Sequence, residues 1–322
     1  MKKIMLILAG SLVCLASLAQ GNNSFSIGGF LQSGYSVDEN SNTFYLKRAR
    51  LAVNGDLSKI ADLPVDFKLQ ADFAGSPKLV DLYVRYKPSA AFNLQFGQFK
   101  LPLTIENPDF SPTKLEFIDY SLVVQRLARM SGNDMSGISA TGRDIGIQAF
   151  GSLIPAADGH YYISYKAGFF NGSGINKSDT DRFKDFTGRI DFNPLSELTL
   201  AGYYMVSLGD EAPRMDRFGG GLSYQGSNFF ARSEYLAGHT GSLYSGGLYA
   251  MCGYKPIDNL SLVARYDRFN PELSLPASQQ YYTVGAIFAP FKFLQFHLNY
   301  TYKTETDHSA ANCFNILMTV SY

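Results

Sequence analysis

The sequence predicts an all-β protein, a transmembrane antiparallel β-barrel of about sixteen strands. Three observations predict this fold: segments of about ten residues alternate apolar and polar side chains, shorter connections alternate with longer ones, and the chain ends inside such a segment. The last nine residues read FNILMTVSY, so one face of this segment is apolar and the other, Leu317 excepted, is polar. The length of 322 residues is one that β-barrels reach as a single domain.

The amino terminus predicts export. The stretch MKKIMLILAGSLVCLASLAQ has two lysines, an apolar stretch and then small residues, which is typical of a secretory signal peptide. We expect residues 1–19 to be cleaved and residues 20–322 to form one barrel domain in the cell outer membrane. A single membrane anchor is the alternative, but the apolar stretch is short for one.

Charge and cysteine content exclude other classes. Removing Lys2 and Lys3 from the 28 basic residues leaves 26 against 28 acidic ones, a balance that argues against binding of nucleic acid. Cys252 and Cys313 remain after cleavage and are expected to be free thiols, because one distant pair is no disulfide framework.

The predicted strands follow one another along the whole chain after the signal peptide. Their number is even, as single-chain bacterial barrels require. The segments lie near residues 24–35, 43–56, 64–74, 78–88, 91–99, 142–152, 160–171, 184–194, 197–208, 215–226, 228–238, 243–256, 259–270, 279–290, 292–304 and 311–322.

The charges favour a barrel over a soluble β-sandwich. In VDFKLQADF, residues 65–73, Asp66, Lys68 and Asp72 share one face and the other face is apolar. A basic side chain that faces lipid at mid-depth costs about 2–4 kcal/mol, so the charged face is expected to line the lumen. Lys47 falls on the apolar face, and we expect it near the outer rim, where it can snorkel.

The connections predict which rim is which. Tight turns such as KPSA, NPLS and KPID are expected on the periplasmic side, and the longer loops on the exterior. Residues 100–141 form the third exterior loop, which is far too long for an ordinary connection. Thr113 and Glu116 have capping-box spacing, and apolar residues follow at helical intervals. We expect this loop to fold into the lumen, where its apolar stripe can be buried. Capping the barrel and packing against a neighbouring subunit are the alternatives.

The sequence gives little support for an enzymatic function. The four histidines, His160, His239, His297 and His308, do not stand in local stretches that suggest a catalytic triad. No CxxC, HExxH or phosphate-cradling GxxxxGK[ST] motif is present. We therefore expect no catalytic residue, no metal and no cofactor.

The expected lumen face carries charges of both signs. Strand parity places nine bases there: Arg48, Arg50, Lys68, Arg85, Lys87, Lys166, Arg189, Arg232 and Arg265. It places seven acids beside them: Asp66, Asp72, Asp81, Asp144, Asp191, Glu234 and Asp267. Rings of basic side chains favour anion passage, whereas salt bridges that only stiffen the wall are the alternative. The pair Arg48 and Arg50 has no acid in its own segment, and Lys114, Arg126 and Arg129 of the long loop could join it at a constriction.

Several segments, in order, resemble the phosphate-selective porin O and P family of Gram-negative outer membranes. They include FYLKRARLAVNGDL, DLYVRYKP, LQFGQFKLP, GRDIGIQAFG, FTGRIDFNP and VARYDRF. The resemblance implies a sixteen-stranded barrel, usually a homotrimer, with an inward-folded third loop and diffusion of small anions. The arginine ladder of the phosphate-selective members matches Arg48 and Arg50 best. The interleaved carboxylates depart from that pattern.

We therefore expect a passive outer-membrane diffusion channel for small hydrophilic solutes, with a mild preference for anions such as phosphate. Its other surroundings would be the lipid bilayer and, in a homotrimer, two further copies. The alternatives are a general or cation-tolerant porin, or a barrel closed by its loop that serves as a structural or adhesive scaffold.

Overall fold

The computed structural model describes residues 24–58, 62–179, 182–209, 215–276, 278–306 and 308–322. The expected signal peptide, residues 1–19, lies outside the described residues. No helix within these ranges is long and apolar enough to cross a membrane. Cys252 is exposed and Cys313 is buried, and both are free thiols, as the sequence predicts.

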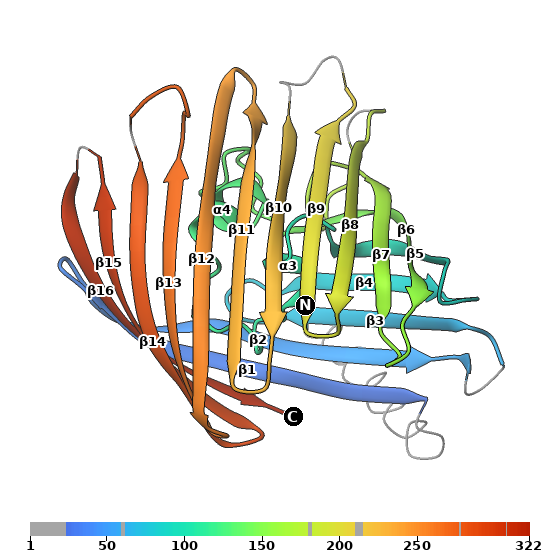
Figure 1. Cartoon of the computed structure of the whole chain (residues 1–322), viewed down its shortest axis with the longest axis horizontal. Helices are drawn as coiled ribbons and strands as arrows, with labels where there is room; N and C mark the ends of the chain where they lie inside the picture. The colour runs from blue at the N-terminus through green and yellow to red at the C-terminus, as the bar shows by residue number, and fades with distance from the viewer. Residues whose placement is uncertain (1–23, 59–61, 180–181, 210–214, 277, 307) are drawn as a thin grey trace.

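Sixteen antiparallel strands form one closed barrel, as predicted (Figure 1). Each strand pairs with its neighbours in the chain, and β1 pairs with β16 to close the sheet. The strands are β1 Phe25–Asp38, β2 Asn42–Asp56, β3 Val65–Asp72, β4 Lys78–Tyr86, β5 Asn93–Lys100, β6 Arg143–Pro155, β7 Tyr161–Phe170, β8 Asp185–Leu195, β9 Leu198–Ser207, β10 Asp216–Gln225, β11 Phe229–Thr240, β12 Leu243–Ile257, β13 Leu260–Asn270, β14 Gln279–Phe291, β15 Leu294–Glu305 and β16 His308–Ser321.

The outer face of the barrel is apolar and the inner face is polar. On β15, Leu298, Tyr300 and Tyr302 are exposed, whereas the alternate residues His297 and Asn299 are buried. Soluble proteins show the opposite arrangement, because their large apolar side chains avoid water. The exposed apolar band therefore faces hydrocarbon, and the charged face lies inside.

One strand departs from simple alternation. Gln32 pairs with Arg48 and Ser33 with Leu46, so Lys47 is the extra residue of a β-bulge in β2. The bulge shifts the register by one residue, which leaves Leu46 78% exposed and lets Lys47 form an ion pair with Asp119 of the long loop. The expectation that Lys47 snorkels from the apolar face is therefore wrong, because period-two reading cannot detect a bulge.

The connections between strands differ in length on the two rims. On the rim shared with both termini they are short, and residues 57–64 form the longest. On the other rim they include residues 171–184, 271–278 and the long segment between β5 and β6. The connections between β1 and β2, β11 and β12, and β15 and β16 on that rim are short, so the alternation of short and long connections holds only in part.

The long segment between β5 and β6 lies inside the barrel (Figure 1). It contains two short helices, α3 Glu106–Asp109 and α4 Leu122–Leu127, and α4 contacts β11, β12 and β13. The expected capping box is absent: Thr113 bonds to Ser111, and the helix begins only at Leu122. The wall competes for the backbone here, because Asn299 accepts from the Ile118 amide at 2.9 Å and Asp267 accepts from the Leu122 amide at 2.8 Å.

The main hydrophobic cluster therefore lies within the barrel, between the loop and the wall. From the loop come Leu101, Leu103, Ile105, Leu115, Phe117, Val123, Val124 and Leu127, and from the wall Met205, Leu236, Tyr249 and Phe269. Apolar packing therefore occupies the middle of this side of the lumen.

Candidate functional site

The inserted loop divides the lumen into a filled side and an open side. The filled side lies against β8–β13, and the open side against β1–β7. The charged residues predicted from strand parity fall into both, so their roles differ.

Glu106 of α3 is the centre of the filled side. Its carboxylate lies 3.5 Å from the guanidinium of Arg232 and 4.0 Å from that of Arg265. It also accepts from the backbone amide and hydroxyl of Ser121 at 2.8 and 2.7 Å. Burial raises the pKa of the Glu106 carboxyl, and the two guanidinium groups only partly offset this effect. This carboxylate ties the loop to itself and to two strands.

Arg232 and Arg265 clamp the same loop from the wall. Arg232 donates to both oxygens of Glu116 and lies 3.9 Å from the centre of the Phe110 ring. Arg265 bonds to Asp267 at 2.7 Å and to the Asp119 carbonyl at 2.9 Å. Both guanidinium groups are thus engaged with the loop and face no open water.

Arg189 and Arg129 have similar positions. Arg189 pairs with Asp191 at 2.7 Å and with Asp109 at 2.6 Å, and donates to the Thr104 carbonyl. Arg129, in the loop, pairs with Asp144 and Asp185 and is 1% exposed. These arginines fasten the loop to the wall. Their salt bridges therefore have the structural role that was the alternative to anion passage.

The remaining two basic residues expected at a constriction lie apart from it. Lys114 is exposed and makes no ion pair within the described part of the chain. Arg126 donates to Gln279 at 3.0 Å and to the Asn133 carbonyl. The structure brings neither side chain to the open passage.

Three cavities follow one another on the open side. The first, of about 200 Å³, lies toward the rim of the termini and contains Ser24, Asp56 and Asp66. It shares Lys68, Tyr83 and Arg85 with a cavity of about 340 Å³, here called the central cavity. The central cavity shares Arg50, Pro112 and Arg143 with a third, of about 130 Å³, under the loop. Shared lining residues make the three cavities one candidate passage.

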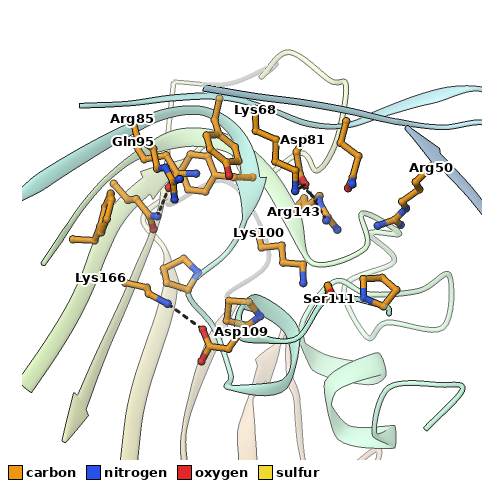
Figure 2. A pocket seen from close by; sticks show the side chains of 18 of the residues that line it. Arg50, Lys68, Asp81, Arg85, Gln95, Lys100, Asp109, Ser111, Arg143 and Lys166 are labelled. Carbon is orange, nitrogen blue, oxygen red and sulfur yellow. Dashed lines mark hydrogen bonds and ion pairs between the residues drawn. The ribbon is translucent and has the colours of Figure 1, made fainter. Parts of the chain in front are cut away.

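The central cavity is rich in basic side chains (Figure 2). Its lining includes the bases Arg50, Lys68, Arg85, Lys100, Arg143 and Lys166, and the acids Asp81 and Asp109. Strands β2–β7 supply the bases, and the loop supplies Asp109 from α3. Of the predicted site residues, the structure therefore brings Arg50, Lys68, Arg85 and Lys166 together here.

The carboxylates on this side are shared between bases. Asp81 lies 2.6 Å from Arg143 and 3.1 Å from Lys68. Asp66 lies 2.7 Å from Arg85 and 2.6 Å from Lys87. One carboxylate cancels only one unit of positive charge, so each group keeps a net positive charge.

Asp109 is also shared between two bases, but its group is neutral, because Arg189 pairs with Asp191 as well. Asp109 pairs with Lys166 at 3.1 Å and with Arg189 at 2.6 Å. Burial alone would raise the pKa of the Asp109 carboxyl, but the two bases outweigh it and hold that pKa below its ordinary value. Asp109 therefore stays charged at neutral pH.

Of Arg48 and Arg50, the charge of Arg50 is compensated by an acid and that of Arg48 is not, among the described residues. Arg50 pairs with Asp72 at 2.9 Å, because β2 and β3 place the two residues directly opposite each other. Arg48 donates to Gln32 at 2.8 Å and forms no ion pair among the described residues. The acid that neutralises Arg50 comes from the next strand, which the local stretch could not reveal.

Sequence reasoning missed three residues of the passage. Lys100 reaches the carbonyls of Asn107 and Phe110, the latter at 2.8 Å, and forms no ion pair in the described part of the chain. Arg143 and Asp109 are the other two. Arg143 begins β6 directly after Gly142, which has a positive φ of 68°, so alternation does not fix its direction. The signal available in the sequence was a basic residue at each end of the long loop, Lys100 and Arg143.

Chemically, the basic side chains of this passage can hold small anions and its acids can hold small cations. In the described ranges, no three His, Cys, Asp or Glu side chains are placed to hold a metal ion. A closed barrel with an apolar outside and a charged internal passage defines a transmembrane channel of the outer-membrane type.

The family follows from the sequence. The model of the phosphate-selective porin O and P family matches residues 19–317, and the chain belongs to this family. It is an outer-membrane porin. A search of curated proteins found no match.

Solved structures share the fold at low identity. The anion-selective porin from Comamonas acidovorans has a TM-score of 0.73 at 11% identity, over 93% of this chain and 99% of that chain. Pseudomonas putida OprB has a TM-score of 0.72 at 11% identity, over 92% and 94%. The trimer form of Vibrio cholerae OmpT has a TM-score of 0.67 at 13% identity, over 92% and 99%.

Proposed function

We propose that this porin is a passive diffusion channel for small hydrophilic solutes with a mild preference for anions, phosphate among them. The sharing of carboxylates between bases carries the proposal. Asp66 and Asp81 each serve two bases, so each of these two groups has one more positive than negative charge. The passage therefore keeps positive charge although its wall is mixed.

The preference is expected to be mild for a physical reason. Each carboxylate lies within about one ion-pair distance of its bases and cancels part of their field. At physiological salt the Debye length is about 8 Å, so the remaining charge acts mainly within the narrow passage. Anions are enriched there, but cations are not fully excluded.

Reversal potentials across a planar bilayer test the proposal. In a potassium chloride gradient, the purified porin is expected to give a reversal potential displaced toward that of chloride. Lys68→Gln with Lys166→Gln should reduce the displacement, because both lysines line the central cavity. Lys292→Gln, in an exposed turn, is the matched control and should change nothing.

Three outcomes would contradict the proposal. A displacement toward potassium would support the cation-tolerant porin, and none at all would support the general porin. A unit conductance near zero would support the alternative, a barrel that is closed by its loop and serves as a scaffold. The filled side of the lumen favours this alternative in part.

We also propose that the chain is exported with cleavage of residues 1–19 and assembles as a homotrimer. OmpT of Vibrio cholerae, which shares the fold, is described in a trimer form. On the outer face, Phe44 and Leu46 are 85% and 78% exposed beside a hollow of about 490 Å³. Protruding apolar side chains of one copy can pack into the hollow of a neighbouring copy. This surface is therefore suited to a contact between copies.

A further inference from the structure

The central cavity has a second chemical character besides its charge. Rings line it together with the bases: Phe30, Tyr83, Phe99, Phe150, Pro102, Pro108 and Pro112. A passage for hydrated inorganic ions needs no such surface, because water and charged groups suffice to replace the hydration shell.

The rings and the bases alternate in space. The guanidinium of Arg50 lies 5.7 Å from the centre of the Phe30 ring, and that of Arg85 lies 5.4 Å from the centre of the Tyr83 ring. Tyr83 in turn meets Phe99 edge to face at 6.1 Å. A solute that enters thus meets a cation and an apolar ring side by side.

One polar group in the cavity lacks a partner. Gln148 is 7% exposed and donates to Gln95 at 3.1 Å, but its Oε1 atom has no hydrogen-bond partner among the described residues. A buried acceptor without a partner is costly unless a ligand or water supplies a donor. The Gln148 side chain lines the cavity, so a rotation of its amide would turn this buried oxygen toward a hydroxyl or N–H group of a solute.

We propose that the central cavity recognises organic anions in which a carboxylate or phosphate group is joined to a flat apolar body, in preference to inorganic anions. The bases hold the oxyanion, Tyr83 and Phe150 contact the flat body, and Gln148 accepts from a hydroxyl where the solute has one. The inference rests on the proposed anion-preferring channel and names its class of solute. A cavity of about 340 Å³ has room for one aromatic ring with its acid group.

Single-channel recording with paired solutes tests the inference. Acetate and benzoate carry the same charge and differ in the ring. The measured quantity is the concentration of each that halves the chloride current through the purified porin. Contact of a flat ring with Tyr83 and Phe150 is expected to lower this concentration about tenfold for benzoate relative to acetate. 4-Hydroxybenzoate should be at least as effective as benzoate, and inorganic phosphate should resemble acetate.

Substitutions at one ring separate recognition from structure. Tyr83→Ala should bring benzoate to the level of acetate, and Tyr83→Phe should keep the difference, because the ring and not the hydroxyl makes the contact. Tyr254→Ala removes a ring from the exposed outer face and is the matched control. The reversal potential in potassium chloride should be unchanged in Tyr254→Ala.

The outcomes distinguish the two proposals. Equal blocking by acetate and benzoate, with an anion-directed reversal potential, would overturn only the recognition of organic anions. If benzoate still blocks Tyr83→Ala at a lower concentration than acetate does, the proposed contact with this ring is wrong. A cation-directed reversal potential would overturn the anion-preferring channel itself.

Discussion

Arg232 and Glu116 form a two-pronged ion pair that joins strand β11 to the inserted loop. Two guanidinium nitrogens donate to the two carboxylate oxygens at 2.7 and 3.2 Å, and both side chains are buried. This pair holds the loop against one side of the barrel and so leaves the passage on the other side.

Glu116→Gln is expected to loosen the loop. The substitution keeps the shape of the side chain but leaves Arg232 with Glu106 as its nearest carboxylate, at 3.5 Å. Loss of one partner of a buried ion pair destabilises by about 3 kcal/mol. The thermal unfolding temperature in detergent should fall, and unit conductance should become larger and noisier. Glu197→Gln, in an exposed turn, is the control; equal behaviour of the two variants would contradict the role of the pair.

Asp81→Asn is expected to strengthen the anion preference. Asp81 serves both Lys68 and Arg143, so a neutral amide leaves two cations uncompensated in the central cavity. The reversal potential in a potassium chloride gradient should move further toward that of chloride. Asp158→Asn, on an exposed turn, should leave it in place. A shift toward potassium in Asp81→Asn would show that the cavity does not determine selectivity.

Arg48 and Arg50 are expected to respond differently. Arg48→Gln should weaken the anion preference with little loss of stability, because Arg48 bonds to Gln32 and no described acid depends on it. Arg50→Gln should in addition lower the unfolding temperature, because it leaves Asp72 buried without its cation. Selectivity and thermal unfolding of the two variants, measured together, check this. Identical unfolding temperatures would contradict the unequal pairing.

Asp109 provides a prediction about pH. Its folded pKa is depressed, so it contributes stability that is fully present above the unfolded value of about 3.9 and is lost as pH falls through the folded value. The difference in unfolding temperature between the native protein and Asp109→Asn should be constant from pH 7 to pH 5 and shrink below about pH 4. A difference that vanishes already at pH 5 would show that Lys166 and Arg189 do not hold Asp109 ionised.

Phe44→Ser with Leu46→Ser tests the proposed contact between copies. Removing these exposed apolar side chains should convert trimers to monomers on unheated gels and in chemical cross-linking. Phe218→Ser with Leu222→Ser, on the outer face of β10, makes the same kind of substitution at less exposed side chains, 40% and 41%, and is the control. Equal loss of trimers in both variants would mean that exposed apolar area in general, and not this contact, stabilises the assembly.

The sequence by itself determined the barrel, because the period-two pattern is local. On β15, exposed Tyr300 and buried Asn299 can be assigned from the chain alone, and each of the sixteen predicted segments overlaps an observed strand. The same parity placed Asp66 and Asp81 on the inner face. An apolar stripe also indicated that the long loop would need a surface to pack against.

Only the tertiary structure decided which charges meet. The partner of Arg50 is set by the register of two strands, and the partner of Arg232 by the path of a loop more than one hundred residues away along the chain. A single bulge turned Lys47 inward, and Glu116 of the expected capping box is held by Arg232 of the wall instead. Periodicity describes each strand in isolation, whereas pairing depends on register and loop closure, which no short stretch of sequence contains.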